Sequence, residues 1–183
     1  MNSEKTKDII IRISFTSLMM ALIYLATQFL AIPYPNGGYF NLSDALIIFT
    51  AIYVGPIESI VAGTVACSLA DLFGGYGAFA PFTIVAKGLE GLVAFVIYYL
   101  LRNKKHLKYI ALPIAAIFMI LTYFIAYIIM FGINYAYISS LFDLIQGLSG
   151  ALIAYILLKA LKNFPLPSHK KSEWQQIIHF LFN

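Results

Sequence analysis

The sequence predicts an all-α integral membrane protein, a six-helix bundle forming one transmembrane domain over residues 1–183. Of the 183 residues, 61% are hydrophobic and 11% are charged, and the mean hydropathy is +0.85. Soluble globular domains carry about 25% charged residues, so the composition argues against a soluble body. A bilayer-crossing helix needs about 20 apolar residues, and about six such runs with short connections fill the chain.

Six candidate spans follow one another, separated by segments that end helices. We expect them at approximately 9–32, 42–55, 57–73, 81–101, 109–132 and 139–162, with a cytoplasmic tail at 163–183. The second span is too short for an ordinary crossing. Either the loop before it dips into the membrane, or this helix starts deep within it.

The first breaks coincide with proline and glycine. AIPYPNGGYF after the first span has two prolines and two glycines and predicts an ordered extracellular loop. Asp44 then falls in the first turn of the second helix, where an acid suits the positive end of the dipole. Gly55-Pro56 ends that helix, and Pro56 followed by Glu58 is typical of a helix start. Both acids therefore have a structural interpretation as helix-terminus residues.

The later connections are also marked by composition. GGYGAFAP, a second ordered extracellular loop, separates the third and fourth spans, and RNKKHLK predicts a cytoplasmic loop. NYAYISS predicts a short polar and aromatic turn before the sixth span. The C-terminal EWQQIIHFLFN fits either a short interfacial helix or a frayed end.

Basic residues predict the orientation. Eleven of the twelve lysines and arginines fall at the N-terminus, in the loop 102–108 or toward the C-terminus, and the loops after spans one, three and five contain none. Cytoplasmic loops are enriched in these residues, so we predict that both termini lie inside. Because the basic residues report topology, they give no support to nucleic-acid binding.

Polar residues gather in the predicted outer half of the bundle, most densely between Asp71 and Gly91. Ionisable groups within spans are costly and usually face a cavity or one another, so this convergence predicts one outward-facing site. The candidate substrate-binding residues are Asn41, Asp44, Asp71, Tyr76, Lys87, Glu90, Asn134, Tyr135, Asp143 and Gln146. The aromatic residues among them also suit a belt at the membrane interface.

Lys87 and Glu90 are three residues apart on one helix face. They form either a structural ion pair or part of a ligand site. Asp71 is expected to share Lys87 and thereby hold the outer loop closed. The glycines of GGYG allow close backbone approach to a ligand, but no GKS or GKT follows, so this is not a phosphate loop.

No catalytic constellation is visible. His106, His169 and His179 belong to the predicted cytoplasmic side or tail, and no ATP-binding motif is present. The single Cys67 supports no disulfide or cysteine-based metal site and is interpreted as a small packing residue. We expect no enzyme activity, cofactor or metal, so active transport would draw its energy from other subunits or an ion gradient.

Small residues form a stripe on the first span. Ser14, Ser17 and Ala21 fall at i, i+3 and i+7, and such stripes let another helix approach closely in lipid. The spacing leaves open whether that helix belongs to this chain or to another.

Residues 41 to 94 resemble the substrate-binding S component of an energy-coupling factor (ECF) transporter. The resemblance lies in the order of LSDA, GP, a small-residue span ending LADL, GGY, APFT and KGLEG. It points to the branch with riboflavin-type and hydroxymethylpyrimidine-type S components. It implies a multi-pass protein of the bacterial cell membrane that captures a vitamin and has no catalytic activity of its own.

The resemblance also implies partners and a lid. The partners are a transmembrane coupling subunit (T component) and two cytoplasmic ATPases, whose ATP hydrolysis topples the S component. Family members dock through Ala-x-x-x-Ala on the first span; here Ser17 and Ala21 stand at those positions, so the stripe with Ser14 is the expected coupling-subunit contact. The family's lid corresponds to residues 33–41, with Tyr34, Asn36, Tyr39 and Phe40.

Several substrates and two other classes of function stay open. A neutral heteroaromatic alcohol such as hydroxymethylpyrimidine or pyridoxine suits the tyrosines and mixed polar groups. Lys87 would suit a carboxylate such as that of pantothenate, and the family branch includes riboflavin. A secondary transporter using Asp71, Lys87 and Glu90 as an ion relay would normally show an internal repeat, which is not visible, and a membrane enzyme or assembly factor lacks catalytic residues.

Overall fold

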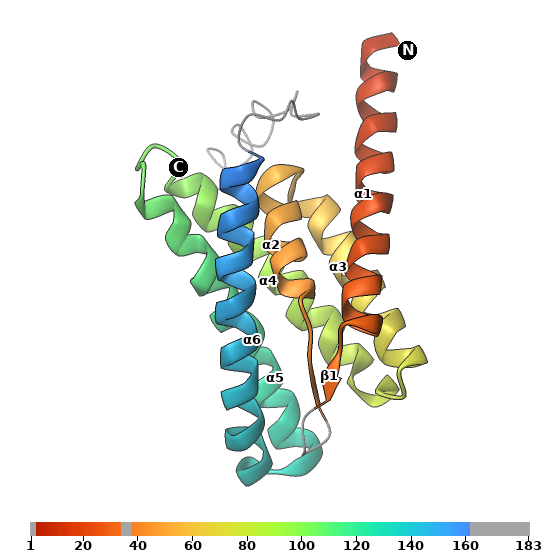
Figure 1. Cartoon of the computed structure of the whole chain (residues 1–183), viewed down its shortest axis with the longest axis vertical. Coiled ribbons are helices and arrows are strands. Elements are labelled where there is room, and N and C mark those ends of the chain that lie inside the picture. Colours follow the sequence, from red (N-terminus) through yellow and green to blue (C-terminus); the bar gives the residue numbers. More distant parts are fainter. Residues whose placement is uncertain (1–2, 34–37, 162–183) are drawn as a thin grey trace.

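A computed structural model describes residues 3–33 and 38–161 of the chain, and these form six α-helices (Figure 1). Five are long and apolar enough to cross a membrane: α1 Ser3–Phe29, α3 Pro56–Phe73, α4 Ala80–Leu100, α5 Ala111–Phe131 and α6 Ile133–Ala160. Short 3-10 turns, Gly77–Phe79 and Leu107–Ile110, lead into α4 and α5. The all-helical prediction is confirmed. The predictions for Tyr34, Asn36 and the tail lie outside the described residues.

The remaining helix, α2 (Ser43–Tyr53), is shorter than the other five and occupies the centre of the bundle. All of its 11 residues except Leu46 and Ile52 are buried, and α3, α4 and α6 pack around it. At 1.5 Å per residue it is about 16 Å long, roughly half the thickness of a bilayer core. It therefore starts deep in the bundle and leaves room beyond its first residue.

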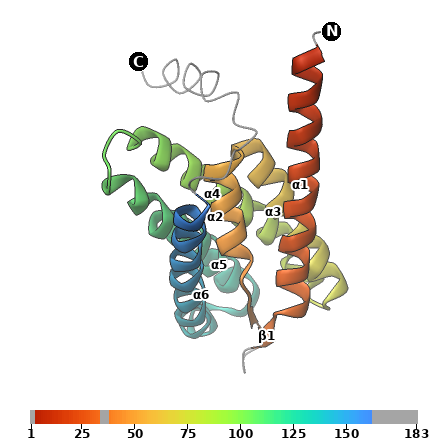
Figure 2. The same ribbon diagram turned by 45° about the horizontal axis from the view of Figure 1, so that its top comes forward.

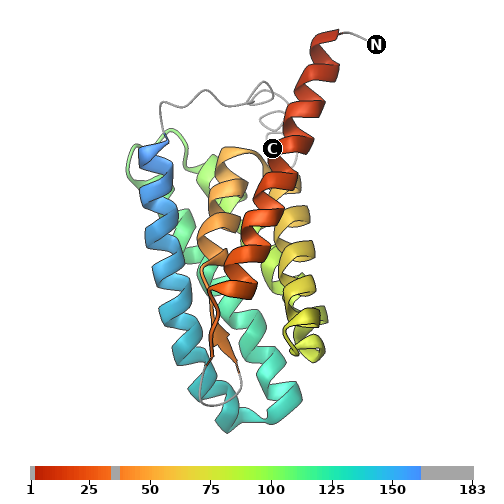
Figure 3. The same ribbon diagram turned by 45° about the vertical axis from the view of Figure 1, so that its right-hand side comes forward.

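The loop before α2 contains a two-stranded antiparallel ribbon. β1 (Ile32–Pro33) pairs with β2 (Tyr39–Phe40), with Ile32 opposite Phe40. Figure 3 shows this hairpin running from the end of α1 to the start of α2 beside α6. It fills the space that the short α2 leaves, and we call this side of the bundle the hairpin end.

The described basic segments share the opposite side, here called the basic end. Figure 1 places the N-terminal turns of α1, the connection between α4 and α5 and the last turn of α6 there. Near it, Arg12 of α1 pairs with Glu58 in the first turn of α3, with Arg12 Nε 2.8 Å from Glu58 Oε1. Glu58 thus joins two helices as well as lying at a helix terminus.

Close packing rests on small residues. One buried cluster around α2 contains Ala51, Ala94, Ala111, Ala115, Ala151 and Ala154. Gly150 of α6 lies so near α2 that a Cβ there would be 2.8 Å from Asp44 Cβ. Helices in lipid associate through such close contacts, and here they fix the depth and position of α2.

The predicted turn NYAYISS is helical, so its assignment was wrong. Gly132, with φ of +88°, makes the connection between α5 and α6, a conformation that glycine adopts without steric cost. α6 consequently begins at Ile133 instead of near 139. Asn134 and Tyr135 lie in its first turn.

Candidate substrate-binding site

A hollow of about 460 Å³, including its open mouth, lies at the hairpin end. Its walls combine aromatic rings, hydroxyls, amides, two acids and one lysine. They are formed by Thr27, Gly38, Tyr39, Asn41, Cys67, Asp71, Tyr76, Phe79, Thr83, Lys87, Tyr123, Tyr127, Asp143 and Gln146. Segments far apart in sequence therefore converge on one space, from α1 to α6.

Most of the residues predicted for the site meet here. Those that line the hollow are Asn41, Asp71, Tyr76, Lys87, Asp143 and Gln146, together with Tyr39 of the predicted lid. Asp44 and Glu90 are not lining residues but contact Lys87. Whether these residues bind a ligand stays a prediction.

Two predicted residues do not line the hollow. Asn134 is exposed in the first turn of α6. The ring centre of Tyr135 is 4.5 Å from that of Phe131 and 5.5 Å from that of the lining residue Tyr127. Because α6 begins earlier than expected, this turn lies beyond the lining segment of the helix. Phe40, next to Tyr39 in β2, is half-buried and is not a lining residue either.

Several lining residues were not predicted. Thr83 lies one turn before Lys87 on α4, a polar residue within a span that spacing could have identified. Tyr123 and Tyr127 are one turn apart on α5 and were counted only as apolar content. Cys67, interpreted as a packing residue, faces the hollow with its Sγ 3.6 Å from Thr27 Oγ1.

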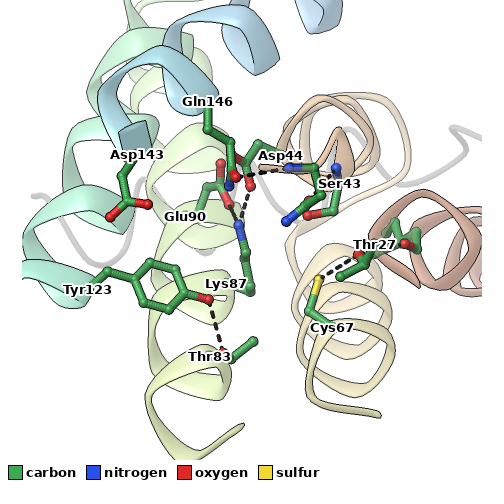
Figure 4. Close-up of polar contacts among 12 residues, drawn as sticks. Thr27, Ser43, Asp44, Cys67, Thr83, Lys87, Glu90, Tyr123, Asp143 and Gln146 are labelled. Carbon is green, nitrogen blue, oxygen red and sulfur yellow. Dashed lines mark hydrogen bonds and ion pairs between the residues drawn. The ribbon is translucent and has the colours of Figure 1, made fainter. Parts of the chain in front are cut away.

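Lys87 is the centre of a buried polar cluster (Figure 4). Its Nζ donates to Asp44 Oδ1 and lies 3.5 Å from Glu90 Oε2. Gln146 Nε2 donates to Asp44 Oδ2 at 2.9 Å, and Gln146 Oε1 accepts from the Asn41 backbone N–H at 3.1 Å. The cluster joins α2, α4 and α6. Lys87 is thus paired with two acids within the protein.

Asp71 has different partners from those expected. The prediction that it shares Lys87 was wrong: Asp71 Oδ1 accepts from Tyr39 O–H and Oδ2 from Thr83 O–H, both at 2.5 Å. Thr83 Oγ1 is also 3.0 Å from the Tyr123 hydroxyl. Asp71 therefore fastens the hairpin to α3 and α4.

Tyr39 covers one side of the hollow. Its ring centre is 4.7 Å from that of Tyr76. Burial, and then the neighbouring Asp71, raise the pKa of the Tyr39 hydroxyl above its ordinary value, because both disfavour a phenolate. The hydroxyl consequently stays protonated and remains a donor to Asp71.

Aromatic rings form another wall, on α5 and the turn before α4. The Tyr123 and Tyr127 ring centres are 6.1 Å apart and nearly parallel, and Phe79 meets Tyr127 edge-on at 5.8 Å. Lys87 Nζ lies 5.8 Å from the Tyr123 ring centre. Such a surface suits a planar ring, which stacks on aromatic side chains.

Asp143 of α6 is the remaining acid of the hollow. Its side chain is 4% exposed, and Oδ1 is 3.4 Å from the Tyr127 hydroxyl. Among the described residues, Oδ2 has no hydrogen-bond partner. Over residues 3–33 and 38–161, no group of three His, Cys, Asp or Glu side chains is placed to hold a metal ion.

The small-residue stripe lies away from the hollow. α1 stands at the periphery against α3 (Figure 2). Ser14, Ser17 and Ala21 are exposed, whereas Met19 and Ile23 on another face are buried. The interpretation of the stripe as a contact within this chain is therefore wrong for the described residues.

Comparison with known proteins identifies the family. A sequence model described as "ECF-type riboflavin transporter, S component" matches residues 7–163. The chain belongs to this family. It is accordingly a membrane-embedded, substrate-binding transporter subunit, as the motif order in residues 41–94 indicated.

Two relatives accompany this assignment. An uncharacterised protein of Pyrococcus woesei is 31% identical over 144 residues, covering 75% of this chain and 95% of that protein. A solved structure described as the S component of a bacterial ECF transporter matches 84% of this chain and 96% of its own, with a TM-score of 0.65 and 20% identity. At that identity the likeness supports the fold of this S component.

Proposed function

We propose that this S component captures a small heteroaromatic vitamin or vitamin precursor, with hydroxymethylpyrimidine or pyridoxine as the best fit. The observation that carries the proposal is the hollow beneath Tyr39, which has tyrosine rings on its walls and buried polar groups at its base. A planar ring can stack on Tyr123 and Tyr127, while hydroxyl or amino substituents meet the polar groups. Pockets of this kind orient ligands through a few placed polar groups in apolar surroundings.

The pairing of Lys87 bears on the choice of substrate. A carboxylate ligand such as pantothenate needs an available cation, but Lys87 already contacts Asp44 and Glu90. The geometry therefore gives pantothenate little support. Riboflavin is the second candidate, because the matching family is the riboflavin-type one and its flavin ring also stacks on aromatic side chains.

The proposed topology places the hairpin end outside and both termini in the cytoplasm, with residues 1–183 as a single transmembrane domain. The gathering of described basic residues at the other end supports it. The hairpin then forms the lid over the hollow, with Tyr39 held by Asp71. The proposed lid also includes Phe40 and, outside the described residues, Tyr34 and Asn36. Single cysteines introduced at Tyr137 and Lys104, each in a Cys67→Ala background, test the orientation with an impermeant thiol reagent: only the first should react in intact cells.

The proposed partners are a T component and two ATPases. The exposed stripe of Ser14, Ser17 and Ala21 is the docking surface for the T component, and ATP hydrolysis topples the S component so that the hollow opens inward. An ion-coupled secondary transporter would instead lose uptake when an uncoupler is added while ATP is maintained. Co-purification with two ATPases supports the ECF assembly.

Native mass spectrometry of the full chain purified from its host membrane tests the substrate. We expect a retained compound with an aromatic heterocycle, and binding of that compound to the delipidated chain with a one-to-one stoichiometry. Retention of a non-aromatic compound would contradict the proposed class. Failure to retain or bind any vitamin or precursor would contradict the proposed function itself.

A further inference from the structure

We infer that the hollow selects a ligand without negative charge, and that this ligand places an N–H or O–H donor against Asp143. An exocyclic amino group, a protonated ring nitrogen or a hydroxyl on a heteroaromatic ring are donors of this class. The inference rests on the proposed function, since it narrows the substrate of the same hollow. It assigns Asp143 as a specificity-determining residue.

The first argument is the balance of charge. Four acids surround the hollow or lie directly behind it: Asp44, Asp71, Glu90 and Asp143. Among the described residues that line it, Lys87 is the one basic side chain. Like charges repel strongly where water is scarce. Acidic side chains therefore outnumber basic ones around the hollow, which suits a neutral or cationic ligand better than an anionic one.

The second argument is which carboxylate oxygens are already bonded. Asp44 uses one oxygen for Lys87 and the other for Gln146. Asp71 uses its two for Tyr39 and Thr83. These two acids hold the protein together and have no oxygen without a donor. They are structural parts of the hollow.

Asp143 differs from these acids. It lines the hollow and is only 4% exposed, and its Oδ2 has no hydrogen-bond partner among the described residues. A buried carboxylate oxygen without a donor is unfavourable. Glu90 also has oxygens without hydrogen bonds, but it lies behind the wall, 3.5 Å from the Lys87 ammonium. Asp143 is therefore the acid placed to accept from a ligand.

The third argument is the position of Asp143 beside aromatic rings. Its Oδ1 is 3.4 Å from the Tyr127 hydroxyl, and the Tyr127 ring lies nearly parallel to that of Tyr123. Figure 4 shows Asp143 and Tyr123 on the same side of the cluster. A ring stacked on the tyrosines can direct a donor on its edge at the carboxylate. Aromatic faces with an acid also favour cations.

A ligand series tests the inference on the wild-type chain. Pyridoxamine, pyridoxine and 4-pyridoxate share one ring and carry an aminomethyl, a hydroxymethyl or a carboxylate group at the same carbon. 4-Amino-5-hydroxymethyl-2-methylpyrimidine and its 4-oxo counterpart form a second pair. We measure Kd by calorimetry on the full chain in detergent, and we identify the compound retained by the native chain by mass spectrometry.

We expect the retained compound to be neutral or cationic. The carboxylate member of the series should bind with a Kd at least about 10-fold higher than those of its partners, because it loses roughly one hydrogen bond to a charged group. A retained or tightly bound anion would overturn the inference and leave the proposed function standing. Absence of any retained compound together with no binding of any probe would overturn both.

A matched pair of variants tests the residue. Asp143→Asn keeps the size of the side chain but removes its charge, and we expect it to weaken the retained compound's Kd by about 10- to 100-fold without changing the melting temperature of the empty chain. Asp8→Asn makes the same chemical change near the start of α1, at the basic end, and should leave Kd unchanged. Equal affinities of Asp143→Asn and wild type would overturn the role of Asp143.

Discussion

Replacing Lys87 with methionine removes the cation of the buried cluster and keeps a side chain of similar length. Lys87 is 2% exposed, and its partners Asp44 and Glu90 are both fully buried. In the variant two carboxylates face each other without a counter-ion, and Asp44 retains only its bond from Gln146. We therefore expect a large loss of stability.

The magnitude follows from this arrangement. Breaking a buried ion pair by removing one partner costs about 3–5 kcal/mol, and here a single change leaves two acids unpaired. For a chain of this size, that lowers the melting temperature by roughly 6–20 °C. Glu90→Gln should cost less than about 1 kcal/mol, because neither Glu90 side-chain oxygen has a hydrogen-bond partner among the described residues and removing its charge relieves repulsion with Asp44.

Thermal unfolding of the purified chain in detergent measures these changes. Lys104→Met, the same substitution at an exposed position of the basic end, is the control and should shift the melting temperature little. The double variant Lys87→Met with Glu90→Gln should recover about 0.5–3 kcal/mol relative to Lys87→Met alone, because the two sites are coupled. A Lys87→Met chain that melts with the wild type would refute the reasoning, since the acids would then need no counter-ion.

Three further changes address the lid, the docking surface and the packing of α2. Tyr39→Phe removes the hydrogen bond that holds the hairpin to Asp71 of α3. Ligand dissociation in stopped-flow measurements should therefore be about 10-fold faster or more. Ser17→Trp should abolish assembly with the T component and uptake into cells, with Kd of the isolated chain unchanged. Gly150→Ala places a Cβ 2.8 Å from α2 and should lower the free energy of unfolding by about 1–3 kcal/mol.

Each of these changes has a control or a contrary result. Tyr39→Phe with an unaltered dissociation rate would show that the hairpin does not retain the ligand. Ile145→Trp introduces the same bulky side chain at an exposed site on a different helix, α6, and should preserve uptake. Loss of ligand binding in Ser17→Trp would speak against docking at the stripe. Gly88→Ala meets its nearest atom at 3.4 Å, so it should be tolerated; equal effects of the two alanine variants would contradict close packing at Gly150.

The sequence predicted much of the fold because apolar length and helix breaks are local properties. Pro56 marks the start of α3 and Gly55 the end of α2, and the structure begins and ends these helices within a residue or two. NYAYISS was misjudged because polar and aromatic residues suit both a turn and the end of a membrane helix. Only the backbone at Gly132 decides between them.

The site was predicted as a group, but of its pairings only that of Lys87 with Glu90 was foreseen. Polar residues inside apolar spans are detectable one by one, which is why Asp71, Lys87 and Asp143 were identified. Which acid meets Lys87 depends on how far α2 extends into the bundle. Asp71, the nearest acid before Lys87 in sequence, faces Tyr39 and Thr83, while Asp44, 43 residues away, reaches the ammonium.

Composition, motif order and the positions of lysine and arginine thus determine that this chain is a helical membrane protein with polar residues concentrated toward one end, because each is a property of a residue or a short segment. Tertiary structure alone decides which acids are neutralised and which oxygen is left for a ligand. Those outcomes depend on distances between helices, and the alanine and glycine contacts around α2 set these distances. Asp143 is a predicted polar residue in the sequence; its unbonded Oδ2 exists only in the folded bundle.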